Sequence, residues 1–331
     1  MKIATWKSIV LGGVVGFALT AAGGLVARFY LGCRRADRAW ASARYPKLKD
    51  MGAVKRLTIL PLIDWYTAHE GLIGEPGVSY LVEADDTTIL FDVGYNMQEE
   101  HPSPLLRNME ALGVKLEDVE CIVISHLHCD HVGGMGCQRR RTFALSGEPL
   151  DLSGMTAFVP EPMTHPTATV EVVEEPRGIA PGVATIGPIG RALFFLGWVE
   201  EQSLAVNVEG KGIVLIVGCG HQGVRRIVER AEMLFDEPLY GLIGGLHLPV
   251  TASRETLLGI PLQRLAGTGR PPWSPLRKSD VEKVLAYLKG KRLQLVGLSA
   301  HDSCDWTLAA FREAFGPAYR EVKVGQRITV A

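Results

Sequence analysis

The sequence predicts an α/β protein, because short apolar strands alternate with amphipathic helices in both halves of the chain. The chain has 331 residues, of which 47% are hydrophobic and 21% are charged. This length and composition exclude a disordered, collagenous or coiled-coil protein and allow one large domain or two ordinary ones. A run of twenty uncharged residues at 8–27 adds a predicted N-terminal transmembrane helix to this fold class.

The apolar run comes first along the chain. As a helix rising 1.5 Å per residue it would span about 30 Å, the thickness of the hydrocarbon core of a bilayer. Its length favours an uncleaved anchor over a signal peptide, although the small residues at 20–24 also suit cleavage. More basic residues follow the run than precede it, so the positive-inside rule predicts a single-pass membrane protein with its body in the cytoplasm.

Charge is unevenly distributed behind this run. The first 50 residues carry nine basic and two acidic residues, a net charge of +7, whereas the remaining 281 carry a net charge of −8. We therefore expect an anchor at 1–33, a basic linker at 34–55 and a folded body at 56–331. The acidic body argues against nucleic acid as a partner. Six cysteines fit a set of reduced thiols, although their even number also permits disulfides.

The first half of the body begins with extended segments. Leu57–Ile63, 78–83 and 88–91 are apolar runs separated by turn-forming residues, a pattern typical of a β-meander. A helix should follow, with Ser103 as its N-cap, proline at its first position and Gly113 after its last turn.

The second half repeats the alternation. Gly212–Val217 and 293–298 have the composition of buried strands, and apolar residues at helical spacing predict helices at 224–231 and 279–290. The glycine- and proline-rich stretch at 251–275 is expected to be a long loop or lid beside the functional site.

Potential metal ligands concentrate just after a predicted strand at 121–124. Three imidazoles and one carboxylate, those of His126, His128, Asp130 and His131, occur within six residues. Nitrogen and oxygen donors are the ligands that borderline cations such as Zn²⁺ prefer, and a loop at a strand end allows them to converge. The spacing therefore predicts a metal site.

The sequence HLHCDH at 126–131 matches the HxHxDH signature of the metallo-β-lactamase superfamily, and Phe91-Asp92-Val93-Gly94 resembles its upstream Asp-x-Gly loop. Elements at 218–223 and 244–248 are similar to the subgroup named after 7,8-dihydropterin-6-ylmethyl-4-(β-D-ribofuranosyl)aminobenzene-5′-phosphate synthase. The resemblance covers about residues 57–304. It implies a four-layer αβ/βα sandwich, the metallo-β-lactamase fold, for a catalytic domain at 56–331, with metal ligands on loops at one edge.

The resemblance also implies roles for individual residues. His126 and His128 would bind a first metal, and Asp130 with His131 a second. The implied cofactors are one or two divalent ions; zinc is favoured, and manganese and iron fit the same donors.

Three later residues would complete the set. Glu201-Gln202 stands where many members have an additional histidine, and we expect His221 to replace it. Cys219 lies where a bridging ligand would fall, but a buried structural cysteine fits equally well. His301 is expected to be the last ligand. There the chain has His301-Asp302-Ser303-Cys304, a departure from the His-Cys-Thr-Gly of the subgroup.

The expected activity is hydrolysis, in which a metal-bound hydroxide attacks a small ester, phosphoester or related substrate. Asp130 would bind metal or orient the hydroxide, and His221, His247 or Asp302 would carry protons. A structural role for His247 is an equal alternative. Other open readings are a synthase-like transferase on a pterin and a non-catalytic metal- or ligand-binding protein. Arg139-Arg140-Arg141 fits either phosphate recognition or an ordinary solvated loop.

Overall fold

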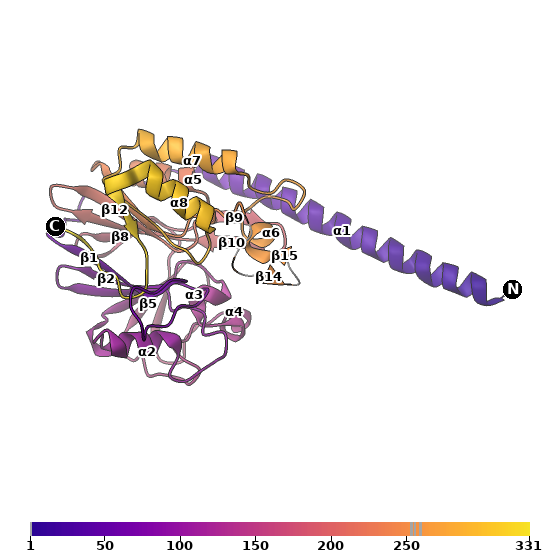
Figure 1. Ribbon diagram of the computed structural model, residues 1–331, viewed down its shortest axis with the longest axis horizontal. Helices are drawn as coiled ribbons and strands as arrows, with labels where there is room; N and C mark the ends of the chain where they lie inside the picture. Colours follow the sequence, from indigo (N-terminus) through magenta and orange to yellow (C-terminus); the bar gives the residue numbers. More distant parts are fainter. Residues whose placement is uncertain (1, 252–253, 255, 258–259) are drawn as a thin grey trace.

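A computed structural model describes the backbone of residues 2–251, 254, 256–257 and 260–331, and the side chains of residues 20–251, 254 and 263–331. Two seven-stranded sheets form the body (Figure 1). In hydrogen-bonding order the first contains β18 (Ile328–Val330), β1 (Leu57–Ile63), β2 (Ser79–Ala84), β3 (Thr87–Phe91), β4 (Cys121–Val123), β5 (Thr156–Val159) and β6 (Thr169–Val172). The second contains β17 (Tyr319–Glu321), β16 (Leu295–Leu298), β13 (Leu239–Gly244), β12 (Gly212–Val217), β11 (Leu204–Val208), β8 (Val183–Thr185) and β7 (Arg177–Ala180).

Helices cover the outer faces of the two sheets. The helices that follow the strands of the first sheet are α2 (Pro104–Ala111), α3 (Cys129–Val132) and α4 (Met135–Arg140). The second sheet is covered by α5 (Val224–Leu234), α7 (Lys278–Gly290) and α8 (Asp305–Phe315). Two hairpins, β9 (Ile189–Leu193) with β10 (Gly197–Glu201) and β14 (Thr256–Leu257) with β15 (Ile260–Pro261), and the short α6 (Leu262–Ala266) complete the body.

Alternation along the strands creates the layers. In β12, Val214 and Ile216 face a core shared by both sheets, whereas Ile213, Leu215 and Val217 face the helices α5, α7 and α8. Successive side chains of a strand point to opposite faces, so a strand buried on both sides is apolar throughout. The predicted four-layer αβ/βα arrangement is confirmed.

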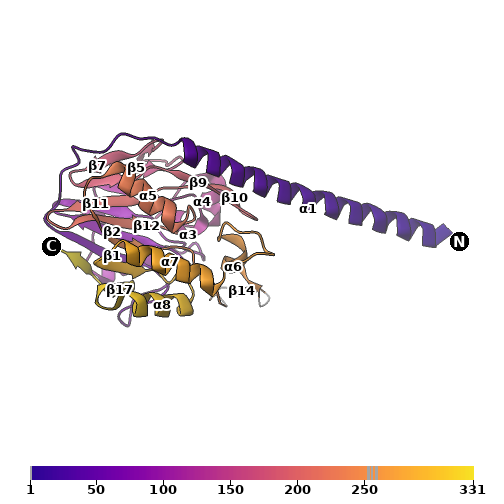
Figure 2. The ribbon, with the colours of Figure 1, turned by 90° about the horizontal axis from the view of Figure 1, so that it is seen from above.

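The N-terminal helix α1 (Lys2–Ser42) is a single element of 41 residues that projects away from the body in both views (Figures 1 and 2). Its body end packs on β9 and β10: Phe29 joins a small core with Ala192 and Phe194, and the Arg35 guanidinium lies over the Trp198 ring. The helix runs on through residue 33, where we expected the anchor to end.

The predicted transmembrane helix was wrong: within the part of the chain that the structure describes, no helix is long and apolar enough to cross a membrane. The side chains of 8–19 lie outside the described residues. From Thr20 onward the helix carries four arginines and uses its apolar stripe to pack on the β9–β10 hairpin. The apolar residues at the end of the predicted run, Leu25 and Val26, therefore pack against protein.

Candidate metal centre

The strand ends bring the predicted ligands together. Strands β12, β13 and β16 run parallel in one sheet, and β3 and β4 run parallel in the other. The carboxyl ends of parallel strands lie at a common edge, where ligand-binding loops gather. Each predicted ligand follows one of these ends: 126–131 follows β4, Cys219 and His221 follow β12, and His301 follows β16.

A first group consists of three imidazoles. Nε2 of His126 lies 3.0 Å from Nδ1 of His128, and Nδ1 of His128 lies 3.1 Å from Nε2 of His221. Burial lowers the pKa of His128 to about 4 and holds the pKa values of His126 and His221 well below their usual range. The three rings are therefore neutral at pH 7, the form in which imidazole binds metal.

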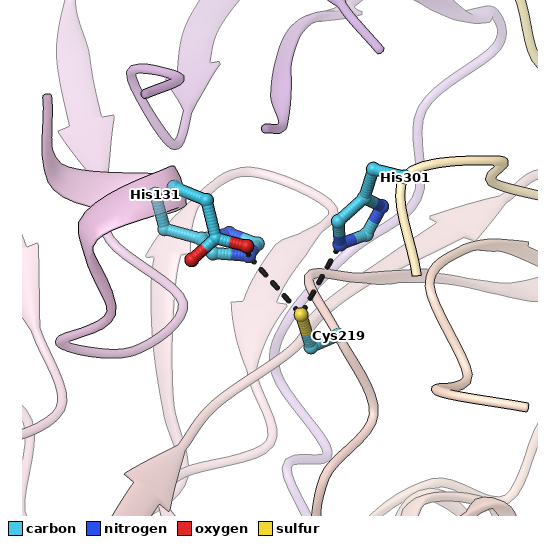
Figure 3. Close-up of side chains that lie close together, drawn as sticks. His131, Cys219 and His301 are labelled. Atoms are coloured by element: carbon cyan, nitrogen blue, oxygen red, sulfur yellow. Dashed lines mark hydrogen bonds and ion pairs between the residues drawn. The ribbon is translucent and has the colours of Figure 1, made fainter. Parts of the chain in front are cut away.

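A second group contains Asp130, His131, Cys219 and His301, whose ligand atoms all lie within 4.8 Å of one another. The Cys219 sulfur lies 3.2 Å from Nε2 of His131 and 3.1 Å from Nε2 of His301, and the three side chains point toward one another in Figure 3. Asp130 approaches His131 at 3.5 Å. Burial by itself would raise the pKa of Asp130. The neighbouring histidines, His131 above all, lower it by more, so the pKa lies below its usual range.

The donor set suits a divalent cation. The outer ring nitrogen of His221, Nδ1, lies 2.9 Å from the Gly267 carbonyl and must donate to it, so the Nε2 that faces His128 carries only a lone pair. Buried lone pairs at 3.0–3.1 Å repel unless a proton or cation lies between them. Imidazole, carboxylate and thiolate together are zinc ligands.

Two carboxylates that the sequence did not single out as functional orient the second group. Asp92 lies 2.7 Å from Nδ1 of His131, and Asp64 accepts from the Ser299 hydroxyl, which lies 2.6 Å from Nδ1 of His301. Such outer partners fix the ring orientation and tautomer of metal-binding histidines. Each acid directly follows a strand of the first sheet, a position that could have identified it.

Glu201 organises the loop that connects the two groups. Its carboxylate accepts hydrogen bonds from the backbone N–H groups of Cys219, Gly220 and His221 at 2.9, 2.7 and 2.7 Å. Burial raises the pKa of Glu201 to about 7, against the lowering effect of these bonds. Gln202 instead donates to the Ile124 and Phe158 carbonyls, so neither residue takes the place of the additional histidine.

The two other predicted catalytic residues lie beside the ligands. The backbone N–H of His247 donates to Oδ2 of Asp302 at 2.8 Å, and that oxygen lies 3.9 Å from Nε2 of His301. Nε2 of His247 faces the Gln263 carbonyl at 3.1 Å, whereas its buried Nδ1 has no hydrogen-bond partner among the described residues. His247 has a φ of 47°, a left-handed conformation that is rare outside glycine.

The predicted lid reaches the site through its described part. The Gly267 carbonyl binds His221, the Gln263 carbonyl binds His247, and the Gln263 side chain donates to the His301 carbonyl. One segment thus contacts three histidines of the centre. The arginine run contributes nothing comparable, since Arg141 pairs with Glu161 at 2.6 Å.

The metallo-beta-lactamase superfamily profile matches residues 72–147, which include the 126–131 motif. The chain belongs to the metallo-β-lactamase superfamily. A divalent-metal cofactor is a general property of this fold, and the clustered donors of this member provide candidate sites for it.

Among its relatives, the 7,8-dihydropterin-6-methyl-4-(beta-D-ribofuranosyl)-aminobenzene-5'-phosphate synthase of Methanocaldococcus jannaschii is 24% identical, over 64% of this chain and 84% of that protein. An N-acyl homoserine lactonase of Bacillus cereus is 23% identical, over 44% of this chain and 64% of that protein. The crystal structure of Tm1679, a metal-dependent hydrolase of the beta-lactamase superfamily, is 20% identical, with a TM-score of 0.56 over 83% of this chain and 99% of that one. This last likeness supports the fold.

Proposed function

We propose that this superfamily member is a metal-dependent hydrolase of a small ester or phosphoester. The observation that carries the proposal is the gathering of eight potential ligand side chains from four separate loops into the two adjoining groups described above and a third, overlapping group of Cys219, His221 and His247. The adjoining groups would hold two divalent ions, which would supply Lewis acidity for hydrolysis.

The protein's own groups have separable tasks in this proposal. A bound divalent ion supplies Lewis acidity, polarising a carbonyl or phosphoryl oxygen and acidifying water. Asp92 and Asp64 keep the rings of His131 and His301 in one orientation. Asp130 presents a carboxylate beside His131, where it orients the attacking group by accepting its hydrogen bond.

His247 is our candidate for proton transfer. Its Nε2 must carry the proton, because its hydrogen-bond partner among the described residues is the Gln263 carbonyl, which can only accept. Its Nδ1 then has a free lone pair, and burial lowers its pKa to about 4, which keeps the ring neutral. Asp302 holds the His247 backbone through its Oδ2 and is a positioning residue in this scheme.

The test is turnover of 4-nitrophenyl butyrate and bis(4-nitrophenyl) phosphate by the full chain, with and without added Zn²⁺ or Mn²⁺. We expect metal-dependent release of nitrophenol that His247→Gln reduces without changing the metal content. Bound metal with no turnover of either substrate would contradict a hydrolase and favour a non-catalytic binding protein.

A synthase-like transfer is the second candidate, since the synthase relative matches over 84% of its own length. In that case the Lewis acid would activate a group for attack by a second organic substrate instead of water. Product formation that requires both substrates, with no release in water alone, would distinguish this activity from hydrolysis.

A further inference from the structure

A cluster of guanidinium groups lies beside the metal centre, where α1, β9, the start of α5 and residues 267–270 meet. We define the Arg191 cluster as Arg191 of β9, Arg226 of α5 and Arg270. Arg270 directly follows Gly269, whose carbonyl Arg191 contacts, and burial together with the charges of Arg226 and Arg270 lowers the pKa of the Arg191 guanidinium. The proposed hydrolysis uses none of them.

Arg191 is packed tightly against the lid backbone. Its Nη2 donates to the Gly269 carbonyl at 3.4 Å, and a Cβ placed on Gly269 would lie 2.6 Å from its Nε. That Nε is buried and has no hydrogen-bond partner among the described residues. A buried guanidinium nitrogen without an acceptor costs free energy, and an oxyanion would remove that cost.

The carboxylates nearby do not neutralise the cluster. Arg226 pairs with Asp37 of α1 at 2.6 Å, and Arg270 pairs with Asp280 at 3.0 Å. Within the described residues no carboxylate lies within 4.0 Å of Arg191, so the cluster has one positive charge in excess.

Three residues of the lid segment and the start of α5 carry further unpartnered polar groups. Nη1 of Arg226, both polar atoms of the Gln222 amide and the Thr268 hydroxyl oxygen are buried and have no partner in the described part of the chain. Gln222 is only 1% exposed and directly follows the ligand His221. Helix α5 then begins after Gly223, an N-cap without a capping side chain, and an uncapped N-terminus favours an anion.

The chain itself limits the distance from this cluster to the metal donors. The Gly267 carbonyl contacts His221 at 2.9 Å, and the Gly269 carbonyl contacts Arg191 at 3.4 Å. Two residues of backbone span about 7 Å at most, so Arg191 lies within about 15 Å of the metal-facing nitrogen of His221. A single small molecule can bridge that distance.

We propose that the Arg191 cluster binds an oxyanion, a carboxylate or phosphoryl group, at the end of the substrate remote from the hydrolysed bond. The inference rests on the proposed function in so far as the ligand is called a substrate. Anion binding itself does not depend on turnover. Arginine presents a planar fork of donors that matches both kinds of oxyanion.

The first test is calorimetric titration of the metal-loaded full chain with inorganic phosphate and, separately, succinate. Arg191→Gln should weaken binding of at least one probe by about tenfold or more, because charge-assisted hydrogen bonds are lost. Arg191→Lys keeps the charge and should recover part of the affinity. The matched control is Arg225→Gln, since the Arg225 side chain is 70% exposed and precedes Arg226 in the same helix. The preferred probe distinguishes phosphoryl from carboxylate.

Binding unchanged in Arg191→Gln would mean that the probes bind only at the metals, and this would overturn the inference, as would a wild-type chain that binds neither probe. A second measurement uses turnover: Arg191→Gln should raise KM for mono-4-nitrophenyl succinate and leave KM for neutral 4-nitrophenyl butyrate unchanged. An equal rise for both substrates would contradict the inference. Loss of turnover for both, with probe binding intact in the wild type, would contradict only the hydrolase.

Discussion

The two groups of donors differ in what holds them. In the second group, carboxylates support the histidines: Asp92 bonds His131 directly, and Asp64 reaches His301 through Ser299. In the first group Asp92 reaches only His126, indirectly through the Ser125 hydroxyl, and the outer partner of His221 is the neutral Gly267 carbonyl. The second group also contains two donors that can carry negative charge.

Two adjoining sites on one sheet edge therefore need not be equivalent. Anionic donors and carboxylate-backed imidazoles bind a dication more strongly than neutral imidazoles alone. The first group depends in addition on the lid segment, because Gly267 belongs to it. We therefore expect tighter binding at the second group and greater sensitivity to the lid at the first.

The largest effect is expected from His128→Ala, which removes the central ring of the first group. The variant should bind one equivalent of metal fewer and retain the other. Its kcat/KM should fall by more than about 100-fold, which is the upper limit of the effect expected when only a residue hydrogen-bonded to a metal ligand is lost. Metal analysis of the purified variant and steady-state assays would measure both. If His128→Ala and His301→Ala each lost all metal, the two groups would be a single site.

Asp92→Asn should act mainly on the second group, because Asp92 contacts His131 directly but reaches His126 of the first group only through Ser125. Loss of the carboxylate at Nδ1 of His131 is expected to weaken metal binding there by about 10–100-fold. Competition with a chromogenic chelator would give both affinities. Asp86→Asn in an exposed turn is the matched control and should change neither. Equal weakening at both groups would show that they do not bind independently.

Gly267→Ala should act on the first group through the lid. The new methyl would overlap the His247 ring, so the segment must move and strain the bond from His221 to the Gly267 carbonyl. Losing one hydrogen bond predicts about a 2–10-fold weaker first site and a lower kcat. Gly290→Ala, where a Cβ meets nothing within 4 Å, is the control. Weakening at the second site instead would reverse our assignment of the lid.

The smallest effect on either group is expected from Phe311→Ala. Phe311 is fully buried in α8 against the outer face of the second sheet, so its truncation should lower the free energy of unfolding by about 3–5 kcal/mol. Metal affinities should stay the same, since the residue contacts no ligand. Chemical denaturation and chelator competition would measure the two quantities; metal loss under native conditions would show that folding and binding are coupled there.

Local patterns predicted local structure well. Leu57–Ile63 and Gly212–Val217 are the strands β1 and β12 at the expected bounds, and the predicted N-cap Ser103 accepts a hydrogen bond from the Leu106 N–H at 3.2 Å. Strands β5 to β11 were not predicted. Most of them are short, and β6 and β7 are partly exposed, so their apolar pattern is weak.

The N-terminal helix shows the opposite failure. Apolar composition predicted a helix correctly, but no described helix is long and apolar enough to cross a membrane, and Leu25, Val26 and Phe29 pack on the β9–β10 hairpin. A hydropathy pattern measures the need to bury a surface and does not identify what covers it.

Residue type and short-range spacing were enough to predict the secondary structure around the 126–131 motif and the kind of donors that it offers. Only the tertiary structure decided that His221 joins His126 and His128, that Cys219 lies between His131 and His301, and that Asp92, Asp64 and Gly267 hold the rings. These contacts join residues up to 235 positions apart, and the pairing of two separate sheets brings them together. No periodicity in the chain records that pairing.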